Sequence, residues 1–284
     1  MTIKAADVKN LREKTGLGMM ECKKALEEAN GNLEDAITNL RKNSALKAEK
    51  KSSRTAVEGI ISARKSDRGI IFAEVNCETD FVAKDENFLS FCENSIDFAV
   101  ENSAVENLLD TVSQGMEEQR MSLVQKIGEN IIIRNVREIS GKVADFYIHS
   151  NKKIAAGVTL INGDESLAKE IAMHIAATNP LVLSPDDLDK DYISKEREIF
   201  MSQVEGEDKP KEIIEKMVEG KLKKQLSDVS LLKQPFVKDP SKTIETLLSE
   251  SGSEIENFVR LEVGEGIEVE KKDFAEEVKS QLEG

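Results

Sequence analysis

The residue types that could carry nucleophilic, acid–base or metal chemistry are few and widely scattered in this sequence. The cysteines are at positions 22, 77 and 92, and the histidines are His149 and His174. A nucleophilic Cys22 activated by either histidine is one conceivable enzyme arrangement. No oxyanion-hole motif, glycine-rich phosphate loop, CxxC pair or cluster of carboxylates accompanies it. We therefore predict a protein that is not an enzyme and that holds neither a metal ion nor a cofactor.

The charge of the chain argues against nucleic acid as the main partner. The formal net charge is −14, with 54 acidic against 40 basic residues, and an acidic surface repels a phosphate backbone. The basic stretch at residues 42–54 leaves an RNA-binding translation protein as an alternative. Aromatic residues do not interleave with the basic ones there, which disfavours that alternative.

The sequence also indicates where the protein works. It contains no run of about 18 apolar residues, so no membrane span is predicted. Residues 1–7 lack the apolar segment of a signal peptide and the arginines of a transit peptide. An odd and scattered set of cysteines favours free thiols in a reducing compartment. These features predict a cytoplasmic protein.

Helical periodicity dominates the N-terminal part of the chain. Residues 5–41 read as three short helices, the last with apolar residues from Leu33 to Leu40 at spacings of three and four and with Asn32 as its cap. Residues 42–56 carry five basic residues and few large apolar ones. This segment is predicted to be a solvated linker, helical or flexible, with contact to an acidic partner as the alternative.

The middle of the chain changes to a β-pattern. Two hairpins are predicted, over residues 59–76 and 146–162, each followed by a helix. The pair Val75-Asn76 aligns with Ile161-Asn162, which indicates a duplication. Two related αβ subdomains with antiparallel sheets are the simplest interpretation.

Residues 185–226 are charged and read as a helical hairpin with a turn at 206–210. Its predicted apolar stripes are Ile193, Glu196, Ile199, Phe200 and Gln203 on the first helix, and Ile214, Met217, Val218 and Leu222 on the second. Residues 274–282 read as a short amphipathic helix. The expected organisation is a bundle at 1–41, a basic linker at 42–56, core subdomains at 57–140 and at 141–184 with 227–266, a hairpin at 185–226 and a C-terminal module at 267–284.

Four short signatures occur in order along the chain. They are LREKTGLGMMECKKAL at residues 11–26, NCETDFVAK at 76–84, AMHIAA at 172–177 and RLEVGEG at 260–266. Together they resemble the elongation factor Ts family, and the likeness extends from about residue 5 to residue 276. The resemblance implies an α+β, multidomain protein with an N-terminal bundle similar to ubiquitin-associated (UBA) domains, a coiled-coil insertion and a C-terminal helix.

The resemblance also implies a function. Family members are guanine-nucleotide exchange factors that bind elongation factor Tu in its GDP-bound and nucleotide-free forms and promote GDP release. Thr79, Asp80, Phe81 and Val82 would then disturb the Mg²⁺ and phosphate region of that partner, with Phe81 as a wedge between helices. The residues alone favour a simpler interpretation, in which Thr79 or Asp80 caps a helix and Phe81 packs inward.

Further contact residues follow from the same resemblance. The bundle would dock on the partner's G domain through Met19, Met20, Cys22 and Lys23, and Ile127 and His149 would add contacts. On residue type alone, methionines in a small bundle are more often core. The turn after His149 is Ser150-Asn151-Lys152-Lys153, where the family often has glycines, which weakens the assignment of His149. His174, in an alanine-rich helix, is predicted to be structural.

Two questions remain open at this level. The charged hairpin is predicted to be a solvated arm, with self-association or an added partner contact as alternatives. A protein that binds elongation factor Tu tightly but exchanges its nucleotide poorly is the alternative to an exchange factor.

Overall fold

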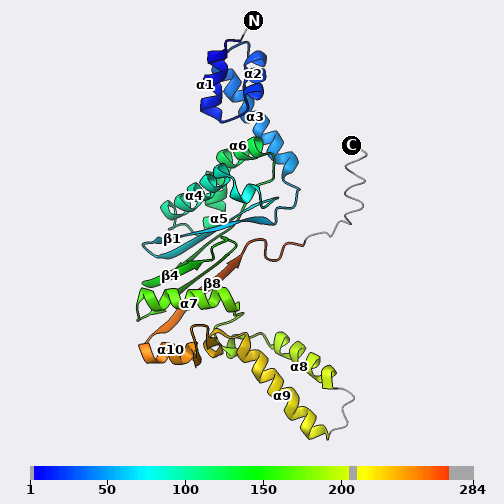
Figure 1. Cartoon of the computed structure of the whole chain (residues 1–284), viewed down its shortest axis with the longest axis vertical. Coiled ribbons are helices and arrows are strands. Elements are labelled where there is room, and N and C mark those ends of the chain that lie inside the picture. Colours follow the sequence, from blue (N-terminus) through cyan, green and yellow to red (C-terminus); the bar gives the residue numbers. More distant parts are fainter. Residues whose placement is uncertain (1–2, 205–209, 269–284) are drawn as a thin grey trace.

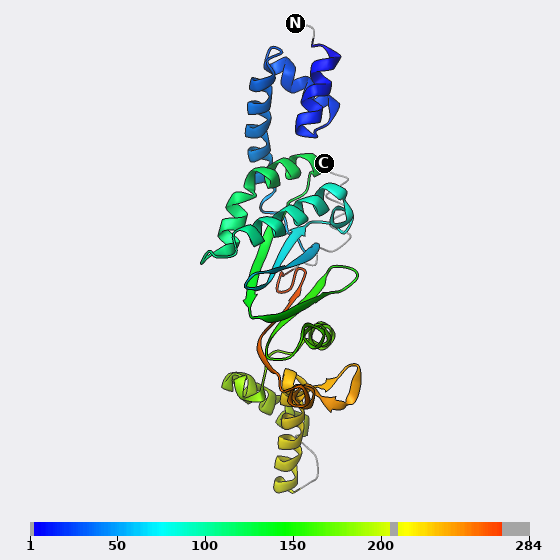
Figure 2. The same cartoon turned by 90° about the vertical axis from the view of Figure 1, so that its left-hand side faces the viewer.

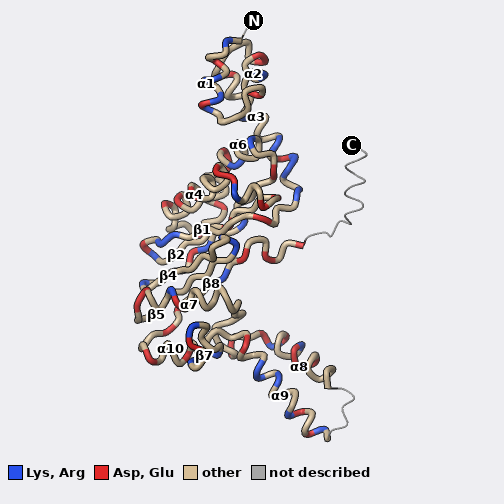
Figure 3. Tube along the Cα trace, viewed as in Figure 1, with Lys and Arg blue, Asp and Glu red and all other residues tan. Residues whose placement is uncertain are grey.

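The computed structural model describes residues 3–204 and 210–268. The molecule is elongated (Figure 1): a helical bundle lies at one end, two stacked sheets with their helices form the body, and a helical arm lies at the other end. Acidic and basic residues are interspersed along the described chain (Figure 3). The mixture of helices with small antiparallel sheets confirms the predicted α+β class.

The bundle consists of α1 (Ala5–Thr15), α2 (Met19–Glu28) and α3 (Leu33–Lys51). Gly16 ends α1 in the left-handed conformation, with φ 68°. Asn32 begins α3, as predicted, because its side chain accepts hydrogen bonds from the backbone N–H groups of Glu34 and Asp35. The buried side chains are Val8, Leu11, Leu17, Cys22, Ala25, Leu26, Ala29, Ala36 and Leu40.

The predicted basic linker differs from the structure in one respect. Its first part continues α3 as far as Lys51, so the helical alternative is observed, but this helix is not a solvated tether. It packs against α6 (Glu117–Ile127), and Arg41 pairs with Glu118 at 2.9 Å. Ala48 belongs to the hydrophobic cluster that also contains Phe88, Ile96 and Val124, which we call the first core. Small residues on one face of α3 allow this close packing, and basic residues on the other face made the segment look solvated.

The first sheet has the order β1-β2-β3, all antiparallel, from β1 (Glu58–Ser66), β2 (Gly69–Cys77) and β3 (Ile132–Ser140). One face is covered by α4 (Glu86–Glu101), α5 (Leu108–Gly115) and α6. The short η1 turn (Val82–Lys84) joins β2 to α4. Every residue of β2 is buried because both of its faces are covered.

The second sheet has the order β4-β5-β8, from β4 (Val143–Ile148), β5 (Ile154–Ile161) and β8 (Glu254–Glu262). Its outer face is covered by α7 (Glu165–Thr178), which is seen end-on in Figure 2. The segments β6 (Pro235–Phe236), β7 (Asp239–Thr243) and α10 (Ile244–Ser251), with the short turns η2 (Pro185–Asp187) and η3 (Leu231–Lys233), complete this part. The structure confirms both predicted hairpins, whereas α5, β6, β7 and α10 were not predicted.

The two sheets repeat one irregularity. A bulge lies between Glu74 and Val75 where β2 pairs with β3, and between Thr159 and Leu160 where β5 pairs with β8. The structure therefore matches Val75 with Leu160, and the sequence alignment of Val75 with Ile161 was wrong by one residue. Val75 is 1% and Leu160 2% exposed, but Ile161 is 48% exposed. A slip of one residue turns every side chain to the other face of a sheet.

The sheets pack face to face between the two helical layers (Figure 2). The shared inner layer contains Ile61, Ala63, Ile70, Phe72, Ala144, Ala155, Val259 and Leu261. Phe72 and Phe146 meet edge to face with their ring centroids 6.2 Å apart. Gly157 lies beneath Phe72, and a Cβ at this position would be 2.5 Å from the Phe72 ring. The spacing of the sheets therefore depends on the absence of a side chain at Gly157.

The arm is an antiparallel pair of helices, α8 (Lys190–Val204) and α9 (Lys211–Asp228). Val204, Val218 and Leu222 are buried between them. The stripe predicted on α9 is the observed one. On α8, however, Ile199 and Gln203 of the predicted stripe are exposed, and Val204, which was not predicted, is buried. The C-terminal helix predicted at residues 274–282 lies outside the described residues.

The contact at Gly157 yields a stability prediction. We expect Gly157→Ala to lower the free energy of unfolding by about 1–3 kcal/mol, because the new methyl group overpacks the inner layer against Phe72. Urea unfolding followed by circular dichroism measures this. The matched control is Gly220→Ala in α9, where a Cβ meets nothing within 4 Å and where alanine should stabilise the helix by about 0.5–1 kcal/mol. Equal stability of the two variants would contradict this account of the sheet packing.

Candidate functional site

The most unusual surface residue is Phe81, on the loop that leaves the central strand β2. We call residues 78–82 the Phe81 loop. Phe81 is 80% exposed, while the next two residues, Val82 and Ala83, are buried beneath it. The helix-start interpretation is therefore wrong for Phe81. Asp85 caps α4 instead, accepting hydrogen bonds from the N–H groups of Asn87 and Phe88.

Hydrogen bonds hold the base of this loop. The Glu129 carboxylate accepts from Glu78 N at 3.1 Å, Thr79 N at 3.0 Å and Thr79 Oγ1 at 2.7 Å. In return, Asn130 N donates to Glu78 Oε1 at 2.6 Å. The loop thus projects an apolar ring from a base joined to the end of α6. Sequence analysis missed Glu129, which belongs to no motif and lies far from the loop in the chain.

A surface ion pair flanks the ring. Lys84 Nζ donates to Asp80 Oδ2 at 2.8 Å. This hydrogen bond lowers the pKa of Asp80 and raises the pKa of Lys84. The β4–β5 turn lies nearby, because Lys153 pairs with Glu58 at 2.6 Å and Glu58 is the sheet partner of Cys77, the last residue of β2. Asp80 therefore presents a carboxylate next to Phe81.

The thiols of the body do not offer a nucleophile. Burial, and after it the negative charge of Glu129, raises the pKa of Cys77 to about 12. Burial also raises the pKa of Cys92. Cys22 is buried in the bundle, whereas His149 and His174 belong to the second half of the body. Among the described residues, no group of three or more histidine, cysteine or acidic side chains is arranged to hold a metal ion.

The start of α2 exposes two methionines. Met19 is 60% and Met20 74% exposed, and Lys23 is exposed on the same helix, where it pairs with Glu27 at 3.7 Å. Both methionines thus lie outside the bundle core. Cys22 is fully buried, so it cannot touch a partner's surface, and its assignment as a contact residue is corrected to a core position.

The last two predicted contact residues differ in exposure. Ile127, at the end of α6, is half-buried against the first core. His149 is exposed at the end of β4, and its Nδ1 lies 3.1 Å from Asn151 Oδ1. The turn that follows is fixed to the first sheet, because Ile61 N donates to Lys152 O at 2.8 Å and Lys153 pairs with Glu58 at 2.6 Å.

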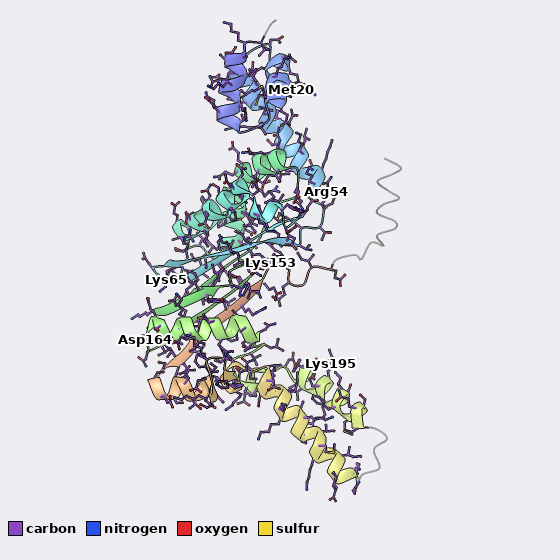
Figure 4. All side chains as sticks on the ribbon, in the orientation of Figure 1. Met20, Arg54, Lys65, Lys153, Asp164 and Lys195 are labelled. Atoms are coloured by element: carbon purple, nitrogen blue, oxygen red, sulfur yellow. The ribbon has the colours of Figure 1, made fainter. Side chains whose placement is uncertain are left out.

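These segments share one edge of the molecule. In Figure 4, Met20, Arg54 and Lys153 lie along one side of the bundle and body, and Lys65 and Asp164 lie along the other. Arg54 pairs with Glu78 of the Phe81 loop at 3.6 Å. The fold therefore brings α2, the Phe81 loop and the β4–β5 turn to a common edge, although they are distant in sequence.

His174 is a structural residue, as predicted. It is buried, and Val237 N donates to its Nδ1 at 3.3 Å, so Nε2 carries the proton and donates to Gln234 Oε1 at 2.9 Å. These bonds connect α7 to the segment around β6. Both ring nitrogens are therefore occupied within the fold.

Phe81, Met19 and Met20 are the large apolar side chains that α2, the Phe81 loop and the β4–β5 turn leave exposed. None of the helices within residues 3–204 and 210–268 is both long and apolar enough to cross a membrane.

Comparisons with known proteins identify the family. The model of the family described as Elongation factor TS matches residues 78–265. A protein of Marinobacter nauticus named Elongation factor Ts is 50% identical over 97% of this chain and 96% of its own length. Proteins with the same name from Hahella chejuensis and Pasteurella multocida are 49% and 50% identical, over 99% and 97% of both chains. The chain belongs to the elongation factor Ts family, which is a family of translation elongation factors.

The burial of His174 yields a prediction on pH. Burial lowers the pKa of His174 below its ordinary value of 6.5, so as the pH falls through about 6.5 the unfolded chain takes up a proton that the folded protein does not. Stability should be fully present above that pH and should fall below it. We expect His174→Gln to flatten this loss in urea titrations from pH 7 to pH 5. An unchanged slope in His174→Gln would contradict the assignment.

Proposed function

We propose that this protein is a guanine-nucleotide exchange factor that binds elongation factor Tu and promotes release of its GDP in the cytoplasm. The observation that carries the proposal is Phe81, an aromatic ring that is 80% exposed on a loop with a fixed base. Exposure of a large apolar side chain is costly in a free protein and is useful when a partner buries it.

The proposed mechanism is displacement. Phe81 inserts between helices of the partner's G domain and Asp80 brings a carboxylate to the Mg²⁺ and phosphate region. Thr79 and Val82 form the two ends of the wedge, one bonded to Glu129 and the other buried in the first core. No covalent bond in GDP is broken, so this function requires no acid, base or nucleophile, and the protein is not an enzyme in this proposal.

Thermodynamics sets a requirement on the interface. An exchange factor must bind the nucleotide-free partner more tightly than the GDP form, and GDP must weaken the factor's binding by the same amount. Reversing a 99:1 preference takes about 5.5 kcal/mol. Burial of one phenylalanine supplies only about 1.5–3 kcal/mol. Other contacts must therefore contribute to the difference.

The common edge offers those contacts. In the proposed complex, Met19, Met20 and Lys23 dock the bundle on the G domain, and Ile127 adds an apolar contact beside the Phe81 loop. His149 contacts the third domain of elongation factor Tu from the second subdomain. The position of Met20, Arg54 and Lys153 along one side of the molecule supports a single extended interface (Figure 4).

The units of the chain take distinct roles in this proposal. The bundle at residues 1–41 and the first subdomain at 57–140 engage the G domain. The second subdomain, at 141–184 and 227–266, engages the third domain, and the segment at 42–56 sets the spacing. The hairpin at 185–226 is an arm that self-associates or adds a partner contact.

The wedge is tested with fluorescent GDP bound to purified elongation factor Tu and catalytic amounts of this protein. We expect Phe81→Ala to slow GDP release by about tenfold or more, because the variant loses at least about 1.4 kcal/mol of free energy from burying the Phe81 ring in the partner. Stability in urea should change by less than about 0.5 kcal/mol, because the ring is exposed. Val105→Ala, which truncates an exposed apolar side chain on another loop, is the control and should exchange normally.

Each other outcome has a defined meaning. Normal exchange by Phe81→Ala would retain the exchange function and eliminate the wedge. No acceleration by the wild type, combined with tight binding, would favour the alternative of a binding protein with poor exchange.

The bundle contact is tested by comparing two neighbours on α2. Met20→Ala should raise the dissociation constant for nucleotide-free elongation factor Tu about tenfold, as loss of a buried apolar contact predicts, and should leave the urea midpoint unchanged. Cys22→Ser should instead lower stability, because its side chain is buried in the bundle core. Titration calorimetry and urea unfolding separate the effects. Equal binding by Met20→Ala and wild type would remove α2 from the interface.

A further inference from the structure

We infer that Glu129 is a positioning residue for Phe81, through which it controls the rate of GDP release. This inference rests on the proposed function. Glu129 does not belong to the wedge and is not among the contact residues of the proposed interface. Its role follows from the hydrogen bonds that its carboxylate accepts from the loop.

The carboxylate fills a backbone nest. Two successive N–H groups, of Glu78 and Thr79, both donate to Glu129 Oε2, at 3.1 and 3.0 Å, and the Thr79 hydroxyl donates to Oε1 at 2.7 Å. Successive N–H groups that converge in this way form an anion-binding concavity. Hydrogen bonds to a charged acceptor are also stronger than neutral ones. The two residues that precede Asp80-Phe81 are thus held by one side chain.

The end of α6 places that carboxylate. Gly128 takes the left-handed conformation that terminates α6, with φ 89°, so the chain turns and Glu129 points back to the loop. Lys51 of α3 donates to the carbonyl oxygen of Gly128. The backbone that precedes Glu129 is therefore hydrogen-bonded to the last turn of α3, the helix that begins in the bundle.

The connection is reciprocal. Asn130 N donates to Glu78 Oε1 at 2.6 Å, and Asn130 Nδ2 donates to Arg54 O at 2.8 Å. The two segments are therefore joined in both directions. The Glu129 carboxylate accepts from the backbone of the loop, and the Glu78 carboxylate accepts from the backbone of residue 130. Of the two carboxylates, only that of Glu129 binds Thr79, the residue that immediately precedes Asp80-Phe81.

The ring itself has no comparable support. At 80% exposure Phe81 cannot be positioned by packing against its own protein, so its location is determined by the backbone on either side. Val82 is buried on one side, and the bonds of Thr79 to Glu129 fix the other. Without Glu129, two N–H groups of half-buried residues lose their acceptor and the loop must be ordered when the partner binds.

The experiment compares Glu129→Ala, Glu129→Gln and Glu101→Ala in the full-length protein, using stimulated release of fluorescent GDP from elongation factor Tu. Glu101 is the control because it is an exposed carboxylate at the end of α4. A loop released from Glu129 must lose conformational entropy when it docks on the partner, a cost that the bonded loop has already met. We expect the maximal release rate to fall about tenfold in Glu129→Ala and to stay normal in Glu101→Ala.

The conservative variant separates positioning from charge. The side-chain amide oxygen introduced by Glu129→Gln can still accept from both N–H groups, so we expect this variant to retain the maximal rate within about threefold. A similar loss in both variants would overturn the claim that the hydrogen bonds accepted by this side chain position the loop. Urea unfolding of each variant records any general loss of stability.

A double-mutant cycle tests whether Glu129 acts through Phe81. If it does, Glu129→Ala should reduce the release rate by less than about twofold when Phe81→Ala is already present, because effects on one unit are not additive. A merely structural role would leave the tenfold effect intact in the Phe81→Ala background. That result, or a normal rate in Glu129→Ala alone, overturns the inference.

Failure of the proposed function has a different signature. If the wild type does not speed GDP release, or if Phe81→Ala releases GDP normally, the exchange function or the wedge fails whatever Glu129 does. If the wild type speeds GDP release, Phe81→Ala loses that effect, and Glu129→Ala still behaves as the wild type, then the positioning role alone is wrong.

Discussion

The close approach of the two sheets at Gly157 is the constraint on which the rest of the molecule depends. Phe72 occupies the space above this glycine and meets Phe146 edge to face. Because the layers are so near, β2 is buried on both faces and the Ile61 N–H group reaches the carbonyl oxygen of Lys152 in the β4–β5 turn. The Phe81 loop leaves the same sheet, so this packing also fixes the loop relative to that turn.

A buried charge reinforces the same arrangement. Glu74, 1% exposed on β2, accepts from Arg134 at 3.0 Å, Asn135 at 2.7 Å and the backbone N–H of Gly264 at 2.9 Å. A carboxylate in this environment needs every partner, since an unpaired buried charge is strongly unfavourable. Gly264 follows β8 of the second sheet, and the neighbouring Val263 N donates to Lys153 O at 2.8 Å. One segment therefore joins both sheets and the turn.

Much of this architecture could be predicted because it depends on local patterns. Alternation identified both hairpins, and the signature around Phe81 drew attention to a loop whose ring the structure leaves exposed. The missed features depend on long-range contacts. Leu160 and Ile161 differ by one position, and only burial between layers shows which faces inward. Ile199 has the spacing of a core residue but is exposed. Glu129 lies some fifty positions from Thr79, and no pattern within either segment predicts their hydrogen bonds.

The proposed exchange mechanism would depend on a rigid frame around Phe81. Fixing the backbone of one residue costs about 1–2 kcal/mol of conformational free energy, while burying Phe81 returns only about 1.5–3 kcal/mol. If the loop were mobile in the free protein, ordering even two of its residues on binding would cancel the gain from the ring. The hydrogen bonds from Glu78 and Thr79 to Glu129 already order the loop in the folded, free protein, so this conformational entropy is lost on folding and not on binding. In the proposed complex, the burial of Phe81 would then be available to favour the nucleotide-free state of the partner.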